Sequence, residues 1–422
     1  MLDRLIDHMR DARLRTLALV EDLSDEKLVV CRMDVVNPFL WELGHVAFFY
    51  DACVRGYLDK SPYMLEDAHR IYDSFEVDHD VRWDLRLPSR GETLEYMSRV
   101  AASLEDRLGD RGPSAQESYC YQLSILHEDM HGEAFTHMRQ TLGFSPPTLL
   151  VTDLQPKGAL SGDVEVPGGL FEPGADPEGD QFVFDNEKWA HPVEVASFKV
   201  ARAPVTNSQY TEFVLDGGYA DEELWSIKGL VWLRRTGATC PQYWVQTDQG
   251  WCFRDFDRET ILQSNQPVRH VSFFEAEAFC RWAGRRLPTE AEWEMAASLD
   301  PSSGRKLRYP WGDDMPAPAH ANLDTRVMGT VDVADHPAGD SPVGCRQMLG
   351  NVWEWTASAF YPYPGYIVDL PYREYSAPWF GYRKVLKGGG FATRSRLVNN
   401  TYRNFFEPKR RDVFSGFRTC AL

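Results

Sequence analysis

The sequence predicts a helical bundle followed by a compact α+β domain, an α plus (α+β) fold class. Residues 1–143 contain long runs with apolar residues at helical spacing and few Gly or Pro. Beyond about residue 150, Gly, Pro and Trp are frequent, and short β-rich runs alternate with turns. The chain has 422 residues, of which 43% are hydrophobic, so it is long and apolar enough for two or three folded domains.

Four amphipathic runs make up the predicted bundle. The last run ends at Gly143, ahead of Pro146 and Pro147, which is a usual way for a helix to stop. An extended loop is expected at about residues 59–90. Long helices of this kind favour an up-and-down four-helix bundle. The runs are LDRLIDHMRDARLRTLALVEDL, PFLWELGHVAFFYDACVRGYL, GETLEYMSRVAASLEDRLG and AQESYCYQLSILHEDMHGEAFTHMRQTLG.

The second half is predicted to be rich in loops and short strands. Helical signals persist in two short pieces, near residues 206–216 and 272–283. The proline-containing stretch 144–164 is the expected connector. These boundaries divide the chain into a bundle (1–143), a connector (144–164) and a second domain (165–422).

Charge and targeting signals narrow the classes of partner. The formal net charge is −18, and so acidic a surface disfavours nucleic acid and anionic membranes. The first residues, MLDRLIDHMRDARLRTLALV, lack the apolar core of a signal peptide, which predicts a cytoplasmic location. The eight cysteines form no CxxC pair, so we expect reduced, buried thiols.

Three histidines are the candidate metal ligands. His127 and His131 stand four residues apart on the fourth run, which places both imidazoles on one helix face. His45 lies among apolar residues on the second run, where a bundle interior is expected. Helical bundles build metal sites from such inward residues on facing helices. Three neutral imidazoles leave coordination positions open for catalysis, although they suit iron, zinc and copper alike.

The string HEDMH at 127–131 also has the form H-E-x-x-H of zinc proteases. In that alternative Glu128 would be the general base of a zinc hydrolase. The helix lacks a further downstream ligand in the usual register, and Glu128 projects about 100° away from His127. A partner in a salt bridge is an equally good interpretation of Glu128.

Motifs across the whole chain resemble two known domain types. GNVWEWTAS (350–358), RLPTEAEWEMAA (286–297), YPWGDD (309–314) and VLKGGGF (385–391) resemble the formylglycine-generating-enzyme-like fold, a C-type-lectin-like sulfatase-modifying domain. WELGHVAFFYD and HEDMHGEAF resemble DinB-like bundles. This order of domains resembles the nonheme iron sulfoxide synthases of ergothioneine and ovothiol and the related selenoneine synthase. The tail RNFFEPKRRDVFSGFRTCA is similar to the ergothioneine and selenoneine branch.

The resemblance implies an activity, a metal and substrates. His45, His127 and His131 would bind a catalytic Fe(II), with O2 as co-substrate. The reaction would join C2 of the imidazole of hercynine to a thiol or selenol donor and give a sulfoxide or selenoxide. Cysteine, γ-glutamylcysteine and a selenosugar are the candidate donors, and the sequence does not separate them. The second domain would complete the substrate pocket.

Substrate-binding residues are expected at two places. The quaternary ammonium of hercynine needs aromatic faces, and the family resemblance assigns the tail residues Asn404 and Phe405, with Phe406 beside them, to the betaine pocket. Arginine suits a substrate carboxylate. The candidates are Arg410 and Arg411 in the tail and Arg82 and Arg86 in the long bundle loop.

A tyrosine is expected to deliver a proton near the metal. Some relatives carry it after the WEWT string, where this chain has Phe360, with Tyr361 and Tyr363 close by. Others use a loop of the bundle, and Tyr72 is the first choice here, ahead of Tyr361 and Tyr363. Met130 is a second departure, because many relatives have an amide there.

Two other classes stay open from the residues themselves. One is the zinc hydrolase based on HEDMH, and the other is a non-catalytic DinB-type protein that binds thiols. The cysteines of the second half offer no clear equivalent of the copper-binding pair of formylglycine-generating enzymes. We interpret them as structural, because buried Cys usually behaves as a small hydrophobic residue.

Overall fold

A computed structural model describes residues 2–109, 112–153, 155–248 and 250–422. The chain divides into two compact units, which are residues 1–149 with 369–374, and residues 150–368 with 375–422. The division is not a single cut, because the short segment 369–374 groups with the N-terminal helices. Both parts of the predicted fold class are present: an N-terminal helical region and a C-terminal region of mixed helices and sheets.

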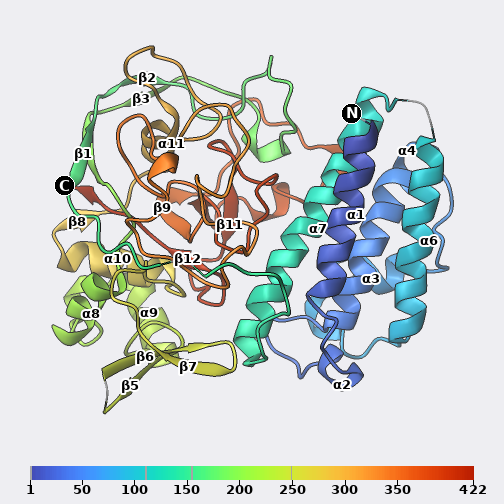
Figure 1. Cartoon of the computed structure of the whole chain (residues 1–422), viewed down its shortest axis with the longest axis horizontal. Coiled ribbons are helices and arrows are strands. Elements are labelled where there is room, and N and C mark those ends of the chain that lie inside the picture. The colour runs from blue at the N-terminus through green and yellow to red at the C-terminus, as the bar shows by residue number, and fades with distance from the viewer. Residues whose placement is uncertain (1, 110–111, 154, 249) are drawn as a thin grey trace. The chain divides into compact units, whose positions relative to one another are not determined.

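The first unit is built on four long helices, labelled α1, α3, α6 and α7 in Figure 1. All four coincide with the predicted amphipathic runs. Helix α3 packs against both α6 and α7, and α1 packs against α7. The long helices are α1 (Leu2–Ala18), α3 (Phe39–Tyr50), α6 (Arg90–Leu108) and α7 (Ala115–Leu142).

Local sequence explains where the last two long helices begin and end. The side chains of Ser89 and Ser114 each accept a hydrogen bond from the backbone N–H three residues later. The glutamate side chain at that later position accepts a hydrogen bond from the backbone N–H of the serine. This reciprocal capping box satisfies two backbone donors at each helix start. Helix α7 ends at Gly143, whose φ of 66° is a left-handed conformation that glycine adopts easily.

Short helical elements fill the connections of the bundle. Helix α3 continues directly into a π-helical turn, a local widening of a helix that is frequent near functional sites. The predicted extended loop between α3 and α6 contains further short helical turns. The elements are α2 (Asp25–Leu28), η1 (Asp51–Gly56), α4 (Tyr57–Asp59), α5 (Ala68–Tyr72) and η2 (His79–Val81), with η6 (Leu370–Tyr372) from the segment 369–374.

Four small sheets organise the second unit. Two sheets have four strands each, in the orders β1-β4-β13-β8 and β11-β10-β9-β12. All pairings in them are antiparallel except that of β12 with β9. Strands β2 and β3 form a separate pair, and β5-β6-β7 form a meander.

The strand bounds are short, as expected for this turn-rich sequence. They are β1 (Asp163–Val166), β2 (Gly169–Phe171), β3 (Val193–Val195), β4 (Phe198–Ala201), β5 (Trp244–Thr247), β6 (Gly250–Asp255), β7 (Arg258–Ile261), β8 (Arg285–Arg286), β9 (Trp353–Ala359), β10 (Lys384–Lys387), β11 (Asn404–Phe406), β12 (Ser415–Gly416) and β13 (Cys420–Ala421).

The second unit has two more helices than the sequence prediction gave it. The predicted pieces are α8 (Asn207–Leu215) and α10 (Phe273–Trp282). The prediction missed α9 (Ile227–Thr236) and α11 (Glu290–Ser298), and it treated the sequence of α11 as part of a β-rich run. Thr289 and Glu292 form a capping box at the start of α11, so a local signal was present. The remaining short turns are η3 (Asp185–Glu187), η4 (Glu222–Leu224), η5 (Pro337–Gly339) and η7 (Ala377–Trp379).

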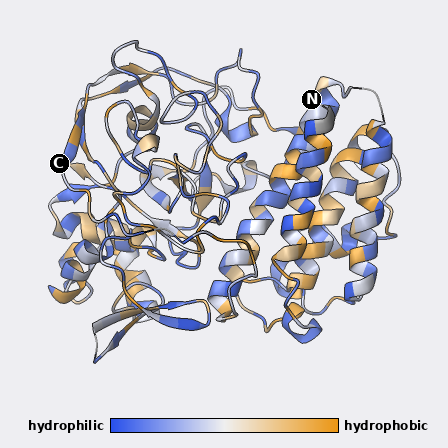
Figure 2. Ribbon diagram, in the orientation of Figure 1, coloured by the Kyte–Doolittle hydropathy of each residue, from blue (hydrophilic) through white to orange (hydrophobic). Residues whose placement is uncertain are grey.

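Apolar burial holds each unit together. One core of the second unit joins β4 and α11 through residues such as Val200, Trp293 and Met348, all fully buried. In Figure 2 the long helices of the bundle carry both hydrophobic (orange) and hydrophilic (blue) residues, as amphipathic helices do. Among the described residues, a search for helices with the length and apolar character of a membrane span finds none.

Candidate metal centre

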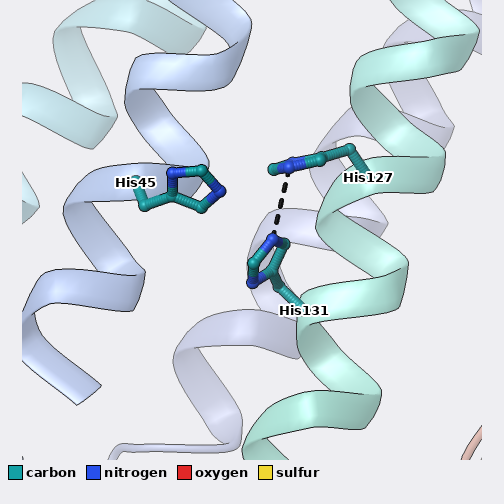
Figure 3. A group of neighbouring side chains, drawn as sticks. All are labelled: His45, His127 and His131. Atoms are coloured by element: carbon teal, nitrogen blue, oxygen red, sulfur yellow. Dashed lines mark hydrogen bonds between the residues drawn. The ribbon is translucent and has the colours of Figure 1, made fainter. Parts of the chain in front are cut away.

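The three predicted ligand histidines come together inside the first unit. His45 projects from α3, and His127 and His131 project from α7, so that the three rings face one another (Figure 3). One nitrogen from each ring lies within 4.8 Å of the others. His45 and His127 are 4% and 1% exposed, and His131 is partly exposed, which leaves one side of the cluster open.

Hydrogen bonds on the outer side of two rings fix their tautomers. Nδ1 of His45 lies 2.7 Å from the backbone carbonyl oxygen of Tyr72, and Nδ1 of His131 lies 2.5 Å from a carboxylate oxygen of Glu42. Both partners can only accept, so both Nδ1 atoms carry the proton and donate. In the neutral form of either ring, Nε2 then carries the lone pair, which is the form that binds a metal.

The nitrogen lone pairs of the cluster lack enough protein donors. Nε2 of His127 lies 3.2 Å from Nε2 of His131, so at most one of these two atoms donates to the other. Nδ1 of His127 is buried and has no hydrogen-bond partner. Buried polar atoms without partners are costly and call for an explanation. A cation bound at the three Nε2 atoms would engage their lone pairs, and Nδ1 of His127 would then be the protonated nitrogen of its ring.

Burial keeps two of the three histidines neutral. It lowers the pKa of His45 to about 3, an effect to which the neighbouring His131 adds. Burial, with the other two histidines, also lowers the pKa of His127 well below its usual value. Both rings are therefore uncharged at neutral pH. Imidazole must be neutral to ligate a metal, so the donor set fits a divalent transition-metal ion without identifying which one.

Glu42 is a functional candidate that the sequence analysis missed. The residue is 3% exposed, and Asn37 Nδ2 donates to its second oxygen at 2.5 Å. Burial alone would raise its pKa, but His131 and the Asn37 amide lower this pKa to about 2. A carboxylate in an otherwise apolar run, three residues before a candidate ligand, is the signal that could have found it.

Glu128, the base of the alternative zinc hydrolase, is engaged elsewhere. Arg13 on α1 donates to its two carboxylate oxygens, with Nε at 2.8 Å and Nη2 at 3.4 Å. Glu128 is 1% exposed, so this is a buried ion pair between α1 and α7. The geometry favours the salt-bridge interpretation over the role of general base.

Aromatic rings cover the outer side of His127. Phe49 stacks on it with ring centroids 3.7 Å apart. Tyr372, from the segment 369–374, meets His127 edge-on with centroids 5.6 Å apart and also contacts Phe49. The hydroxyl of Tyr119 on α7 donates to the carboxylate of Asp369 and ties this segment to the bundle unit. Tyr372 is thus a tyrosine placed against His127 of the cluster, and no local sequence signal indicated it.

Tyr72 was the first choice for proton delivery, and its side chain is deeply buried. Its backbone carbonyl accepts from His45, but its ring stacks on Tyr96 of α6 and lies tightly against Gly44. A Cβ added at Gly44 would come within 2.1 Å of the Tyr72 ring, so only glycine fits there. Burial raises the pKa of Tyr72 to about 12, which makes its hydroxyl a weaker acid. The catalytic role of Tyr72 stays a prediction.

The two arginines of the bundle loop differ in environment. Arg82 is 7% exposed, and its guanidinium lies 3.9 Å from the centre of the Trp41 ring. It donates to Asn37 Oδ1 at 2.8 Å and to backbone carbonyls of the loop. Arg86 is exposed. Their predicted roles in substrate binding are not tested, although Arg82 already has partners within the protein.

The predicted betaine residues lie on strand β11 of the second unit. Phe405 is buried and stacks on Phe360 with centroids 4.1 Å apart. Asn404 and Phe406 point to the opposite face, because side chains alternate along a strand. The strand therefore does not present all three side chains on one face. Their role in the betaine pocket stays a prediction.

The remaining arginine and tyrosine candidates of the second unit mostly have buried partners. Arg410 pairs with Asp412 at 2.5 Å, and Arg411 pairs with buried Glu275 at 2.8 Å. The Tyr363 hydroxyl donates to Glu290 at 3.0 Å, and burial raises the pKa of Tyr363 well above its usual value. Tyr361 is 58% exposed. These assignments also stay predictions.

All eight cysteines are free thiols in the structure. Six are buried, as expected, whereas Cys31 is exposed and Cys240 is partly exposed. Burial raises the pKa of Cys345 to about 11 and that of Cys420 to about 12. Such thiols are protonated and poorly reactive at neutral pH, which agrees with a structural role for them.

Comparisons with known families agree with the two-unit architecture. Residues 151–421 match the family described as sulfatase-modifying factor enzyme 1-like domain. Residues 8–134 match the DinB superfamily. The first match covers the strand-rich second half, and the second covers the helices that carry the three histidines.

Relatives that span nearly the whole chain are hercynine oxygenases. The chain is 38% identical to the one from Mycobacterium tuberculosis over 426 residues, covering 99% of this chain and 98% of the relative. It is 36% identical to the one from Mycolicibacterium smegmatis over 428 residues, with the same coverage. The formylglycine-generating enzyme of Mycobacterium tuberculosis is 34% identical over 51% of this chain and 79% of its own length.

Proposed function

This chain belongs to the hercynine oxygenase family. On that premise we propose that it forms a C–S or C–Se bond on hercynine with O2 as the oxidant. The new bond joins C2 of the imidazole of hercynine to the chalcogen of a thiol or selenol donor. Cysteine, γ-glutamylcysteine and a selenosugar are the donors to test. The product is a sulfoxide or a selenoxide.

The proposed reaction balances with O2 as the sole oxidant. The imidazole loses its C2 hydrogen, and the donor loses the hydrogen of its thiol or selenol. One oxygen atom of O2 becomes the oxygen of the sulfoxide or selenoxide. The other leaves as water with the two hydrogens. O2 accepts four electrons, which come from forming the carbon–chalcogen bond and from oxidising the chalcogen.

The observation that carries this proposal is the cluster of His45, His127 and His131, with nitrogens within 4.8 Å of one another. Three imidazoles leave further coordination positions on a metal. Bound there, Fe(II) would supply a site where O2 and the chalcogen donor meet. The protein's part is to keep His45 and His127 neutral by burial, and to orient His45 and His131 through hydrogen bonds to Nδ1.

Proton delivery is assigned to Tyr372, because its ring lies against His127, one of the three histidines. Its ring lies 5.6 Å from the ring of His127, on a segment held to the bundle unit by Asp369 and Tyr119. A positioned tyrosine acts as a general acid when its hydroxyl reaches the reacting group. The earlier choices, Tyr72, Tyr361 and Tyr363, remain as second candidates.

The substrate's charged groups define the rest of the proposal. The trimethylammonium of hercynine has no N–H to donate, so aromatic faces such as Phe405 or Phe406 would hold it. Asn404 would bind beside them. Substrate carboxylates would be bound by arginine, for which the candidates are Arg82, Arg86, Arg410 and Arg411.

The deciding experiment is aerobic incubation of Fe(II)-loaded protein with hercynine and each donor separately, read by mass spectrometry. The expected product contains both substrates and one oxygen atom, with O2 consumed in equal amount. The His127→Ala protein is the matched control and should give none. A zinc-loaded protein that hydrolyses peptides without consuming O2 would support the hydrolase instead. A protein that binds no metal and gives no product would support a non-catalytic thiol-binding role.

A further inference from the structure

The outer side of the histidine cluster is backed by a chain of polar contacts. It begins at His131, whose Nδ1 donates to Glu42 at 2.5 Å. Glu42 accepts a second hydrogen bond, from Asn37 Nδ2, at 2.5 Å. Its two carboxylate oxygens are therefore held from two sides, in a place where the residue is 3% exposed.

The chain continues from Asn37 to Arg82. Arg82 Nη1 donates to the side-chain oxygen of Asn37 at 2.8 Å, which fixes the direction of the Asn37 amide. The amide nitrogen can then only point at Glu42. Arg82 Nη2 also donates to the backbone carbonyls of Ser74 at 3.3 Å and Val77 at 3.2 Å, so the guanidinium is anchored in its own loop.

The contacts return to the cluster through Trp41. The Arg82 guanidinium lies 3.9 Å from the centre of the Trp41 ring. Trp41 in turn stacks on His45, with centroids 4.8 Å apart and planes inclined by 10°. Its indole N–H donates to the backbone carbonyl of Ile71 at 2.6 Å, which helps to hold the orientation of the ring. A continuous series of contacts thus links His131 to His45, through Glu42, Asn37, Arg82 and Trp41.

Sequence spacing accounts for this arrangement. Trp41 and His45 stand four residues apart on α3, so their rings lie one above the other on one face. Glu42 is the next residue after Trp41 and projects about 100° further around the helix, toward His131 of α7. Trp41 and Glu42 therefore contact His45 and His131, and Arg82 of the loop contacts Trp41 and Asn37 behind them.

We propose that Glu42 is a positioning residue that holds His131 in the tautomer and orientation that bind the metal, and that Asn37 and Arg82 hold Glu42 in place. The proposal rests on the three-histidine metal site of the proposed function. A ligand histidine that donates its other N–H to a carboxylate is a better and more fixed ligand. Loss of such a partner typically weakens metal binding about 10- to 100-fold.

This proposal gives Arg82 a role different from substrate binding, and the two roles can be separated. If Arg82 acts through Asn37 and Glu42, the Arg82→Met protein should bind metal several-fold more weakly. If Arg82 instead binds the carboxylate of a donor, the same variant should keep its metal affinity and show a raised KM for that donor alone.

The test measures Co(II) binding to the full chain without substrates, by competition with a chromophoric chelator and by the visible spectrum of bound Co(II). Glu42→Gln should weaken Co(II) binding about 10- to 100-fold and alter its spectrum. The matched control is Glu128→Gln, which makes the same change at a glutamate just as buried but paired with Arg13. The control should keep both the affinity, within about threefold, and the spectrum.

A second variant keeps the proposal testable if Glu42→Gln does not fold. Asn37→Ala removes the contact between Asn37 and Glu42 at a partly exposed position, and a several-fold loss of Co(II) affinity is expected. Unchanged affinity and spectrum in Asn37→Ala, or equal effects of Glu42→Gln and Glu128→Gln, would overturn the proposal. Glu42→Asp should recover part of the affinity if the carboxylate itself is what matters.

Failure of this proposal is distinguishable from failure of the proposed function. Unmodified protein that binds Co(II) but forms no product with hercynine refutes the oxygenase reaction and leaves the role of Glu42 intact. Protein that forms the product while Glu42→Gln binds Co(II) normally refutes only the role of Glu42.

Discussion

The buried ion pairs of the second unit and the histidine cluster of the first unit, in which two of the three rings are buried, differ in what they leave unsatisfied. Arg418 donates to both oxygens of Glu354 at 2.6 and 2.7 Å, with both side chains at most 1% exposed. Lys387 lies 3.1 Å from Glu294, and both side chains are fully buried. In each pair, opposite charges neutralise one another inside the protein.

The histidine cluster lacks a protein partner that would satisfy its nitrogen lone pairs in the same way. When the rings of His45 and His131 are neutral, their Nε2 atoms present lone pairs, and at most one hydrogen bond can form between His127 and His131. A buried cluster that is complete by itself contributes to the stability of the fold. A buried cluster made mostly of acceptors needs a further donor or a cation to be complete. Burial therefore does not by itself separate a structural cluster from a functional one. The balance of hydrogen-bond donors and acceptors within the cluster separates the two kinds.

The largest expected effect is a loss of stability when the buried ion pair of Arg418 and Glu354 is broken. Arg418→Met leaves Glu354 with a buried, uncompensated charge, so the free energy of unfolding should fall by about 3–5 kcal/mol. Urea unfolding measures it. The control is Arg234→Met, whose pair with Glu222 is exposed on both sides, so this variant should leave the free energy of unfolding almost unchanged. Similar losses in both variants would contradict the distinction.

The next largest effect is on metal binding, at the histidine cluster. His45→Ala removes one of three ligands, so metal affinity should fall by more than the ~100-fold upper range seen for loss of an outer partner. The metal-free protein should lose only about 1–2 kcal/mol of stability. Titration with Fe(II) and thermal unfolding check the two results. His137→Ala, at another buried histidine of α7, should bind metal normally. Full iron occupancy in His45→Ala would rule out the three-ligand site.

An intermediate effect is expected where Tyr372 meets the cluster. Tyr372→Phe removes one oxygen and keeps the ring against His127, so coupling of hercynine to the donor should slow about 10²-fold while metal affinity stays unchanged. Turnover should shift toward oxidation of the donor alone, which product analysis would detect. Tyr72→Phe is the paired measurement. A larger loss in Tyr72→Phe than in Tyr372→Phe would return the role to the buried tyrosine.

The smallest effect on catalysis is expected at Glu128. Glu128→Gln weakens the ion pair with Arg13, so stability should fall by about 1–3 kcal/mol, while turnover with hercynine stays within a few-fold. Steady-state rates at full metal loading measure this. A loss of turnover by several orders of magnitude, with metal binding and fold intact, would show that Glu128 takes part in catalysis. It would then favour the zinc hydrolase.

Much of the fold follows from local sequence. The four bundle helices were predicted from apolar spacing, and α8 and α10 were predicted in the second unit. Helices α9 and α11 are as long as α8 and α10, and they were missed because they lie in turn-rich sequence, where a capping signal competes with many strand and turn signals. The i,i+4 spacing of His127 and His131, with the apolar setting of His45, was enough to select the three histidines.

The sequence by itself determined the elements whose information is local: helix periodicity, caps and the face on which His127 and His131 lie. Only the tertiary structure decided which distant groups meet those histidines. Glu42 reaches His131 across 89 residues, and Tyr119 binds Asp369 across 250, which brings Tyr372 against His127. The physical reason is that spacing along a helix fixes neighbours only within a turn or two. Contacts between helices, and the return of segment 369–374 to the bundle, depend on how whole faces pack.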